Sequence, residues 1–175
     1  MLITHGLYLQ YAGIENTVEL IQEYPSRLKE YLKIAEKAEN SLFETLKSYP
    51  VKILNFGENI DGRFNSSRLL NEYLLPYYQK RIKELHQAEK FCYIHMDGAL
   101  KSLLPYLQDI GFDGIEGATP ITSRRVTLEE LKEAMGDMIL LDGIPILLFL
   151  PEYDYQELEK YTLRTLKLFA PNIIL

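Results

Sequence analysis

Short apolar runs alternate with longer amphipathic stretches along this chain, and the alternation predicts repeated strand–helix units. The apolar runs are short enough for strands, and we expect five of them, at residues 51–57, 91–95, 112–116, 138–142 and 172–175. Between the runs, apolar residues recur at steps of three and four, which gives a helix one apolar face. Strands that alternate with helices in this way indicate right-handed βαβ units and a parallel sheet.

The beginning of the chain lacks this alternation. We expect residues 1–50 to form a helical segment and residues 51–175 to form one structural domain. Asn16 or Thr17 can cap a first short helix. Pro25 suits the first turn of a second helix, because the N–H group that proline lacks is not needed there.

Later residues mark the ends of further helices. Ser66 is expected to cap a helix that Pro76 kinks or splits, since proline has no N–H to donate inside a helix. A short helix is expected over residues 100–110. Thr127 is expected to cap the next helix, with Glu130 three residues on completing a capping box.

Two architectures contain repeated βαβ units: an open doubly wound sheet and an eight-stranded barrel. The open sheet usually carries a glycine-rich phosphate loop after its first strand, and Gly57 and Gly62 do not make that GxGxxG pattern. A complete barrel needs eight strands and about 250 residues, whereas this chain has 175 residues. We therefore expect an α/β fold that is a partial (β/α)8 TIM barrel, with about five parallel strands and outer helices.

The composition of the chain limits the kinds of molecule that we expect it to bind. The net charge of −6 argues against a nucleic-acid binder, which usually presents a basic face. Cys92 is the one cysteine, so the chain can form no internal disulfide or cysteine-rich zinc cluster, and the cytoplasm is the expected compartment. The longest apolar stretch, residues 144–150, is too short to span a bilayer. We expect a cytoplasmic protein that binds a small molecule rather than nucleic acid or a membrane.

Polar residues follow four of the expected strands, each near a glycine. In a parallel barrel the carboxyl ends of the strands converge on one rim, and that rim holds the active site. We therefore expect a catalytic cluster made of Glu58, His95, Asp97, Glu116 and Asp142. A polar residue after a strand is also a common turn former or helix cap, so each residue taken alone has this simpler interpretation.

His95 and Asp97 are two positions apart, so on an extended chain their side chains point the same way. An imidazole and a carboxylate on one face can bind a divalent cation or act as an acid–base pair. The alternative is that Asp97 caps a helix beginning near Ala99 and that His95 has a structural role. Arg124 and Arg125, after the third strand, can contact an anionic substrate or form a solvated pair.

Two runs of the sequence carry a family resemblance. They are FGENIDGRFNSSRLLNEYLLPYYQKRIKELHQAEKFCYIHMDGALKSLLPYLQDIGFDGIEGATP and TLEELKEAMGDMILLDGIP. Over about residues 51–175, with a looser likeness upstream from Gly13, the chain resembles the uroporphyrinogen decarboxylase superfamily. These proteins are (β/α)8 barrels and include the decarboxylase and corrinoid-linked methyltransferases. The likeness is greatest to the methyltransferase-like branch, in which a Pro-Tyr helix leads to a strand ending in His-x-Cys-Gly or His-x-Asp-Gly.

The resemblance implies specific roles for two residues. His95 falls on the position of the zinc-ligand histidine of the methyltransferases, and Asp97 falls on the position of their next ligand, a cysteine. Their last cysteine would lie beyond the final strand of this chain. The resemblance therefore implies the C-terminal half of a barrel, with zinc bound by His95 and Asp97 and with a corrinoid carried by a partner protein.

Three functions are compatible with these observations. The first is methyl transfer, in which a cation held by His95 acts as a Lewis acid on a methyl donor or acceptor. The second is decarboxylation of a tetrapyrrole, uroporphyrinogen, in which Glu58 or Glu116 holds the pyrrole N–H groups. The third is a non-catalytic fragment or half-barrel that needs a partner, either a second copy in a homodimer or an N-terminal half-barrel. In the isolated monomer we expect little or no turnover.

Overall fold

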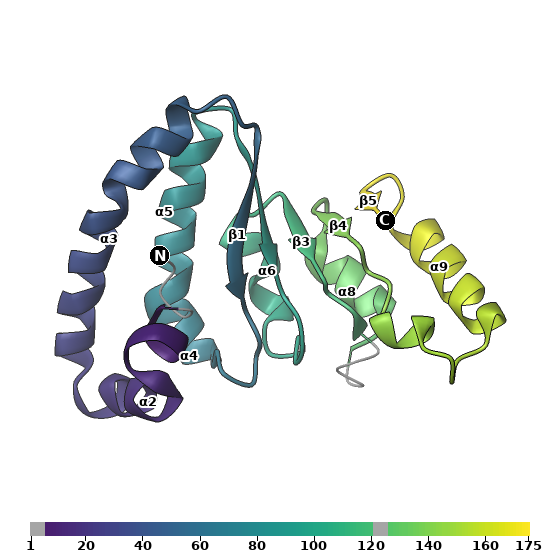
Figure 1. Ribbon diagram of the computed structural model, residues 1–175, viewed down its shortest axis with the longest axis horizontal. Coiled ribbons are helices and arrows are strands. Elements are labelled where there is room, and N and C mark those ends of the chain that lie inside the picture. Colours follow the sequence, from purple (N-terminus) through teal and green to yellow (C-terminus); the bar gives the residue numbers. More distant parts are fainter. Residues whose placement is uncertain (1–5, 121–125) are drawn as a thin grey trace.

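The computed structural model describes residues 6–120 and 126–175, and these residues form one five-stranded sheet (Figure 1). Neighbouring strands are parallel and follow one another in sequence order, from β1 to β5. The strands are β1 (Ile53–Asn59), β2 (Phe91–His95), β3 (Gly114–Glu116), β4 (Ile139–Leu141) and β5 (Ile173–Ile174). The expected α/β fold is confirmed, because sequential parallel strands with flanking helices are what part of a TIM barrel contains.

The register of the sheet sorts its side chains onto two faces. Ile94, Ile115 and Leu140 pair in one row and are fully buried, so this face packs on helices. The next row pairs His95 with Glu116, and both side chains are partly exposed. Because successive residues of a strand point to opposite faces, this row lies on the other face, which we call the open face.

β1 is irregular near its carboxyl end. Between Phe56 and Asn59 the partner strand β2 advances by only one residue, to His95, so Gly57 and Glu58 are extra. An even number of extra residues keeps the alternation of faces. Phe56 and Glu58 are accordingly buried, and Asn59 is exposed beside His95.

The N-terminal segment is helical. It contains a π-helical turn η1 (Gly6–Tyr11), α2 (Gly13–Glu23) and α3 (Pro25–Ser48). The structure confirms Pro25 as the first residue of its helix. The expected caps Asn16 and Thr17 are wrong, because both lie inside α2, whose N-cap position is Ala12. The Thr17 hydroxyl instead donates to the carbonyl oxygen of Gly13 at 2.7 Å, a bond that threonine makes inside helices.

The helix between β1 and β2 is divided. Its parts are α4 (Ser67–Leu69), a π-helical turn η2 (Leu70–Leu74) and α5 (Leu75–His86). Ser66 is confirmed as the cap, since its hydroxyl accepts the N–H of Leu69 at 3.2 Å. Pro76 lies in the first turn of α5, directly after the π-helical turn, so the predicted split is also confirmed.

The remaining helices follow β2, β3 and β4. They are η3 (Leu104–Tyr106), α6 (Leu107–Ile110), α8 (Leu128–Met135), η4 (Ile146–Phe149) and α9 (Tyr155–Phe169). The helix expected over residues 100–110 is wrong in its first part, where residues 101–103 form a turn and Pro105 lies inside a 3-10 turn that begins at Leu104. Thr127 and Glu130 form the predicted capping box at the start of α8.

An aromatic cluster forms the centre of the helix-facing core. The ring of Phe56 on β1 lies 5.0 Å from the ring of Phe112 and 6.3 Å from the rings of Phe43 and Tyr78, measured between centroids. The rings are tilted or edge-on to one another, which is the favoured geometry for aromatic pairs. The cluster joins β1 to α3, to α5 and to the segment that leads into β3.

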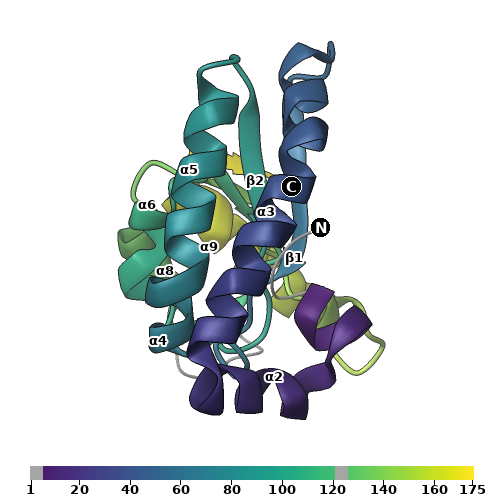
Figure 2. The same ribbon diagram turned by 90° about the vertical axis from the view of Figure 1, so that its left-hand side faces the viewer.

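Buried polar groups join α3 and α5, which lie side by side (Figures 1 and 2). The guanidinium of Arg81 stacks 4.3 Å above the ring of Phe43 and donates to the side-chain oxygen of Asn40 at 2.8 Å. The hydroxyl of Tyr77 donates to the carboxylate of Glu39 at 2.7 Å. These contacts fix the N-terminal helical segment against the layer of helices behind the sheet.

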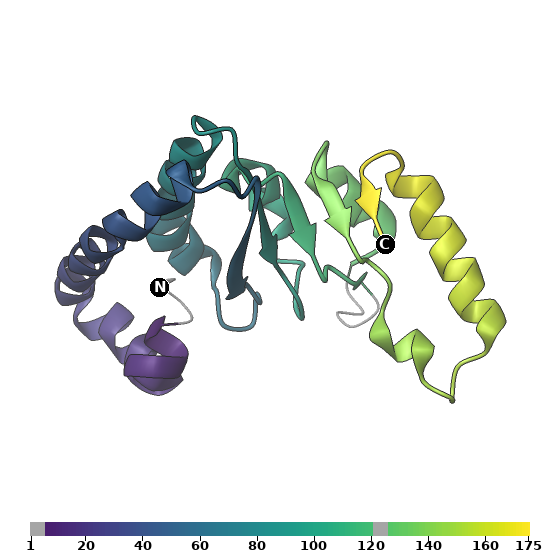
Figure 3. The same ribbon diagram turned by 45° about the horizontal axis from the view of Figure 1, so that its top comes forward.

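The open face exposes large apolar side chains at both ends of the sheet. Ile53 is 64% exposed and Phe91 is 58% exposed, on the neighbouring strands β1 and β2. At the other end, Ile174 on β5 is 58% exposed. Figure 3 shows the strands spread between α3 at one end and α9 at the other. A parallel sheet is normally covered on both faces, so this face differs from the usual arrangement.

Candidate functional site

His95 and Glu116 meet at the carboxyl ends of β2 and β3. They occupy paired positions on neighbouring strands, and the Nδ1 atom of His95 lies 3.3 Å from Oε2 of Glu116. Their side chains are 39% and 30% exposed, so solvent reaches both. The last residues of parallel strands lie at the rim where barrels hold their active sites, and this pair occupies that position.

Gly117 makes room for the imidazole. A Cβ atom at this position would lie 2.7 Å from Cε1 of His95, closer than real Cβ contacts occur. Gly117 also has a φ of +77°, in the left-handed region that glycine adopts without steric cost. The left-handed backbone and the nearby His95 ring therefore both favour glycine after Glu116.

Asp97 lies in the loop that follows β2 and is fixed through its backbone. Its N–H donates to the side-chain oxygen of Asn59 at 3.0 Å, which joins this loop to the end of β1. Its carboxylate accepts the N–H of Gly98. The segment after Ala99 forms a turn rather than a helix, so the alternative role of Asp97 as a helix cap is wrong.

Asp61 and Arg63 are rim residues that the sequence reasoning missed. One carboxylate oxygen of Asp61 accepts the N–H groups of Arg63, at 2.8 Å, and of Ala99, at 3.1 Å. The other oxygen accepts from the guanidinium of Arg63. Asp61 thus ties the loop after β1 to the loop after β2. The run Asn-Ile-Asp-Gly-Arg contained a turn signal, but nothing in it distinguished an anchoring carboxylate from an ordinary turn former.

The electrostatics of this pair are well defined. Burial of the Asp61 carboxyl would raise its pKa, but the hydrogen bonds from Arg63 and Ala99 outweigh burial and lower the pKa below its ordinary value. The same hydrogen bond raises the pKa of Arg63, and the charge of Asp97 adds a smaller effect. The side chain of Arg63 is 65% exposed, so the rim presents a permanent positive charge to solvent.

Glu58 does not join His95 and Glu116, whereas Asp142 directly follows the carboxyl end of β4. Glu58 is 1% exposed on the helix-facing side of β1, where it accepts a hydrogen bond from the hydroxyl of Tyr78. Asp142 is exposed and has a φ of +64°. It lines an apolar groove of about 630 Å³ between β4, η4 and α9, and the lining of that groove includes none of the other predicted site residues. The structure therefore brings His95, Glu116 and the backbone of Asp97 to one rim and places the Glu58 side chain on the helix-facing side, while a catalytic role of Asp142 stays a prediction.

Donor atoms suited to a metal ion converge at a different place. Within residues 6–120 and 126–175, three such side chains lie within 4.8 Å of one another at His86, Cys92 and Asp113, but not at the rim. The rim offers the imidazole–carboxylate pair of His95 and Glu116. Zinc binding by His95 and Asp97 stays a prediction. Arg124, Arg125 and His5 lie outside the described residues.

Comparison with known proteins gives one informative match. No family model matches the sequence, and no curated protein matches it. Among solved structures, a methyltransferase from Methanosarcina mazei superposes with a TM-score of 0.71 at 15% sequence identity. The match covers 91% of this chain and 46% of the methyltransferase, so this chain spans about half the length of that protein. At this identity the likeness shows the fold: this chain has the fold of part of that methyltransferase. None of the described helices is long and apolar enough to cross a membrane.

Proposed function

We propose that this chain contributes to methyl transfer, as a barrel part of the type found in corrinoid-dependent methyltransferases, with His95 and Glu116 at its active rim. The observation that carries the proposal is the 3.3 Å approach of the two side chains on neighbouring strand ends. The fold of a methyltransferase and the sequence resemblance of the His95 strand support the same reaction class. The tetrapyrrole decarboxylase alternative has less support, because one of its two candidate carboxylates, Glu58, is buried against Tyr78 and leaves Glu116 alone.

The chemistry of the pair depends on which ring nitrogen of His95 carries the hydrogen. If Nδ1 of His95 donates to Glu116, the lone pair of Nε2 remains available to accept a proton or to bind a cation. A carboxylate behind a histidine is also the common support of a metal-bound imidazole. The proposal includes a zinc ion held by His95, with Asp97 as a second ligand, and such an ion would activate a thiol or polarise a methyl donor.

Other groups at the rim suit an anionic substrate. Arg63 is mostly exposed to solvent, while Asp61 accepts hydrogen bonds from Nε and one terminal nitrogen of its guanidinium. Guanidinium groups bind carboxylates and phosphates through two parallel hydrogen bonds. The methyl group would be carried by a corrinoid on a partner protein, which the proposal adds from the sequence resemblance.

The open face requires a cover, and we propose that a second copy of this chain supplies it. Ile53, Phe91 and Ile174 expose apolar surface at both ends of the sheet, which is unusual for a parallel sheet in water. Sedimentation over a range of protein concentrations should show a monomer–dimer equilibrium. A monomer at every concentration would contradict the homodimer and leave an N-terminal half-barrel as the cover.

The test of function uses methylcobalamin as methyl donor and a simple alkyl thiol as acceptor, with added zinc. Loss of the methyl–cobalt bond is followed by absorbance at increasing protein concentrations. We expect little turnover where the chain is monomeric and a rate that rises more steeply than the protein concentration. His95→Gln and Glu116→Gln should each abolish the rate, whereas Asp137→Asn, at an exposed carboxylate before the opposite end of β4, should leave it unchanged. A rate that His95→Gln does not alter would overturn the proposed role of the rim.

A further inference from the structure

A second group of potential metal ligands lies at the opposite end of β2 from His95. Cys92 is the second residue of that strand, and its side chain is buried on the helix-facing side. His86 is the last residue of α5, and Asp113 directly precedes β3. Cys92 is three positions before His95 in this strand, or about 10 Å along it. This group is therefore distinct from the rim.

The backbone holds the three residues together. After His86 the chain turns tightly through Glu89, which has a φ of +55°, and enters β2 at once. The N–H of Asp113 donates to the carbonyl oxygen of Cys92 at 2.8 Å, which fixes the start of β3 beside the start of β2. The N–H of Ile139 donates to the carbonyl oxygen of Asp113 at 2.8 Å, so β4 holds the same residue from the other side.

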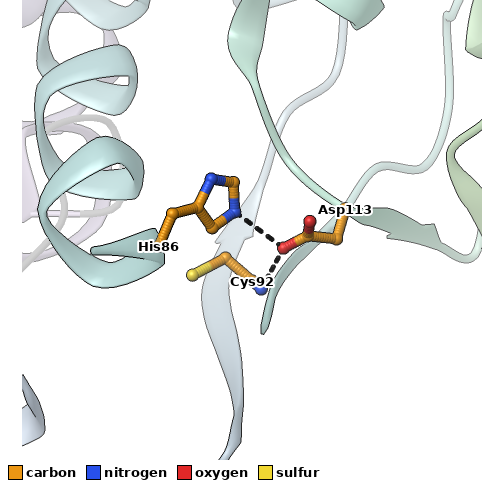
Figure 4. A group of neighbouring side chains, drawn as sticks. All are labelled: His86, Cys92 and Asp113. Atoms are coloured by element: carbon orange, nitrogen blue, oxygen red, sulfur yellow. Dashed lines mark hydrogen bonds and ion pairs between the residues drawn. The ribbon is translucent and has the colours of Figure 1, made fainter. Parts of the chain in front are cut away.

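The side chains converge, as Figure 4 shows. Nε2 of His86 lies 2.9 Å from Oδ2 of Asp113, and the same oxygen accepts the backbone N–H of Cys92 at 2.7 Å. One donor atom from each residue, including Sγ of Cys92, lies within 4.8 Å of the others. In a tetrahedral zinc site, adjacent ligand atoms lie about 3.3–3.8 Å apart, given metal–ligand bonds of about 2.0–2.3 Å. Small side-chain rotations would bring all three atoms to that spacing.

We propose that His86, Cys92 and Asp113 bind a zinc ion. The ligand set is a nitrogen, a sulfur and an oxygen, which is typical of zinc and unsuited to magnesium or calcium. The thiolate and carboxylate together neutralise the double charge of the ion. His86 also lines an open pocket of about 470 Å³, so water can reach the site and supply a fourth ligand.

Zinc binding would release the proton of the Cys92 thiol. Without metal, burial and the nearby Asp113 charge raise the pKa of the Cys92 thiol to about 12, so sulfur keeps its proton at neutral pH. Zinc replaces that proton, which leaves to solvent as the zinc–sulfur bond forms. His86 binds through Nε2 and carries its hydrogen on Nδ1. The carboxylate of Asp113 exchanges its contact with His86 for a bond to the metal.

The ion would have a structural effect. α5, β2 and the start of β3 each contribute one ligand, so the metal would join elements that are consecutive along the chain but separate in space. A ligand that binds only the folded state stabilises it in proportion to the logarithm of its concentration. We therefore expect zinc to raise the Tm of the whole chain.

The experiment uses cobalt(II) as a spectroscopic substitute for zinc in the purified, chelator-treated chain. Because Cys92 is the one cysteine in the sequence, a near-ultraviolet thiolate-to-cobalt band can come from this residue alone. We expect the band to saturate at one equivalent of cobalt and to disappear when zinc is added. Cys92→Ser should abolish it, and His86→Ala should weaken cobalt binding by more than about tenfold.

The matched control is His95→Gln, which removes a histidine from the far end of the same strand. Cobalt bound at the rim would be lost in this variant, but the thiolate band should be unchanged. Circular dichroism of each variant without metal establishes that it is folded. The proposal would be overturned if the unaltered chain shows no thiolate band. It would also be overturned if His86→Ala leaves the band at full strength.

Discussion

Phe56 and Phe91 offer a direct test of which face of the sheet is covered. They lie on the neighbouring strands β1 and β2 and point to opposite faces. Phe56 is 5% exposed and contacts three aromatic rings, whereas Phe91 is 58% exposed on the open face. The same substitution at both positions therefore compares a core position with an open position of the same chemistry.

The expected losses of stability on substitution differ clearly between Phe56 and Phe91. Truncation of a buried phenylalanine to alanine costs about 3–5 kcal/mol. Each aromatic pair that Phe56 loses contributes about 0.5–1.5 kcal/mol to that cost. Full burial of such a side chain is worth about 1.5–3 kcal/mol, so the smaller buried part of Phe91 corresponds to about 1 kcal/mol. Small domains have only about 5–15 kcal/mol of stability, so Phe56→Ala could unfold the chain. Phe56→Leu is therefore measured as well, with an expected cost of about 1–2 kcal/mol.

The assay is urea denaturation of each variant at two protein concentrations, one where the chain is monomeric and one where it is dimeric. In the monomer, Phe56→Ala should lower the free energy of unfolding several times more than Phe91→Ala. In the dimer, the cost of Phe91→Ala should approach that of Phe56→Ala, because the partner buries the ring. A small and concentration-independent effect at Phe91 would contradict cover by a second copy. A cost below about 1 kcal/mol for Phe56→Ala would contradict the aromatic core itself.

Three further substitutions test local features. Thr127→Ala removes the capping box of α8 and should cost about 1 kcal/mol by urea denaturation, whereas Thr127→Ser should keep most of it. Tyr77→Phe removes the hydrogen bond to buried Glu39 and should cost about 1–3 kcal/mol, with exposed Tyr24→Phe near zero as its control. The folded-state pKa of Asp61 is lowered, so its stabilising effect is present above the ordinary pKa of about 4 and is lost as pH falls through the lowered value. Below about pH 4, the free energy of unfolding should therefore fall less steeply with falling pH in Asp61→Asn than in the unaltered chain. An equal slope in the two proteins would contradict this role of Asp61.

The sequence was sufficient for the fold because its signals were local and agreed with one another. Apolar runs separated by capped helices predicted five parallel strands, and Ser66, Pro76 and Thr127 marked helix ends correctly. Asn16 failed as a cap because residues able to cap a helix also occur inside one, and the periodicity did not show where α2 begins.

The candidate site was harder to predict, because it depends on which face each strand residue occupies. His95 and Glu116 followed correctly from the rule that parallel strands end at one rim. Glu58 did not join them, because it lies two residues after buried Phe56 and alternation places both on the helix-facing side, which its position near the strand end did not reveal. Asp61 acts through backbone N–H groups from two loops, which is a tertiary arrangement without a sequence signal.

The irregularity in β1 limits how this part of the chain can change in length. Gly57 and Glu58 are two extra residues, and an even number returns the strand to the same alternation. Loss or gain of a single residue here would exchange the faces, so that a carboxylate would point to the open side and Asn59 would enter the helix layer. Insertions and deletions in pairs would preserve the environment of His95. Length changes at the position of the two extra residues should therefore be tolerated better in steps of two than in steps of one.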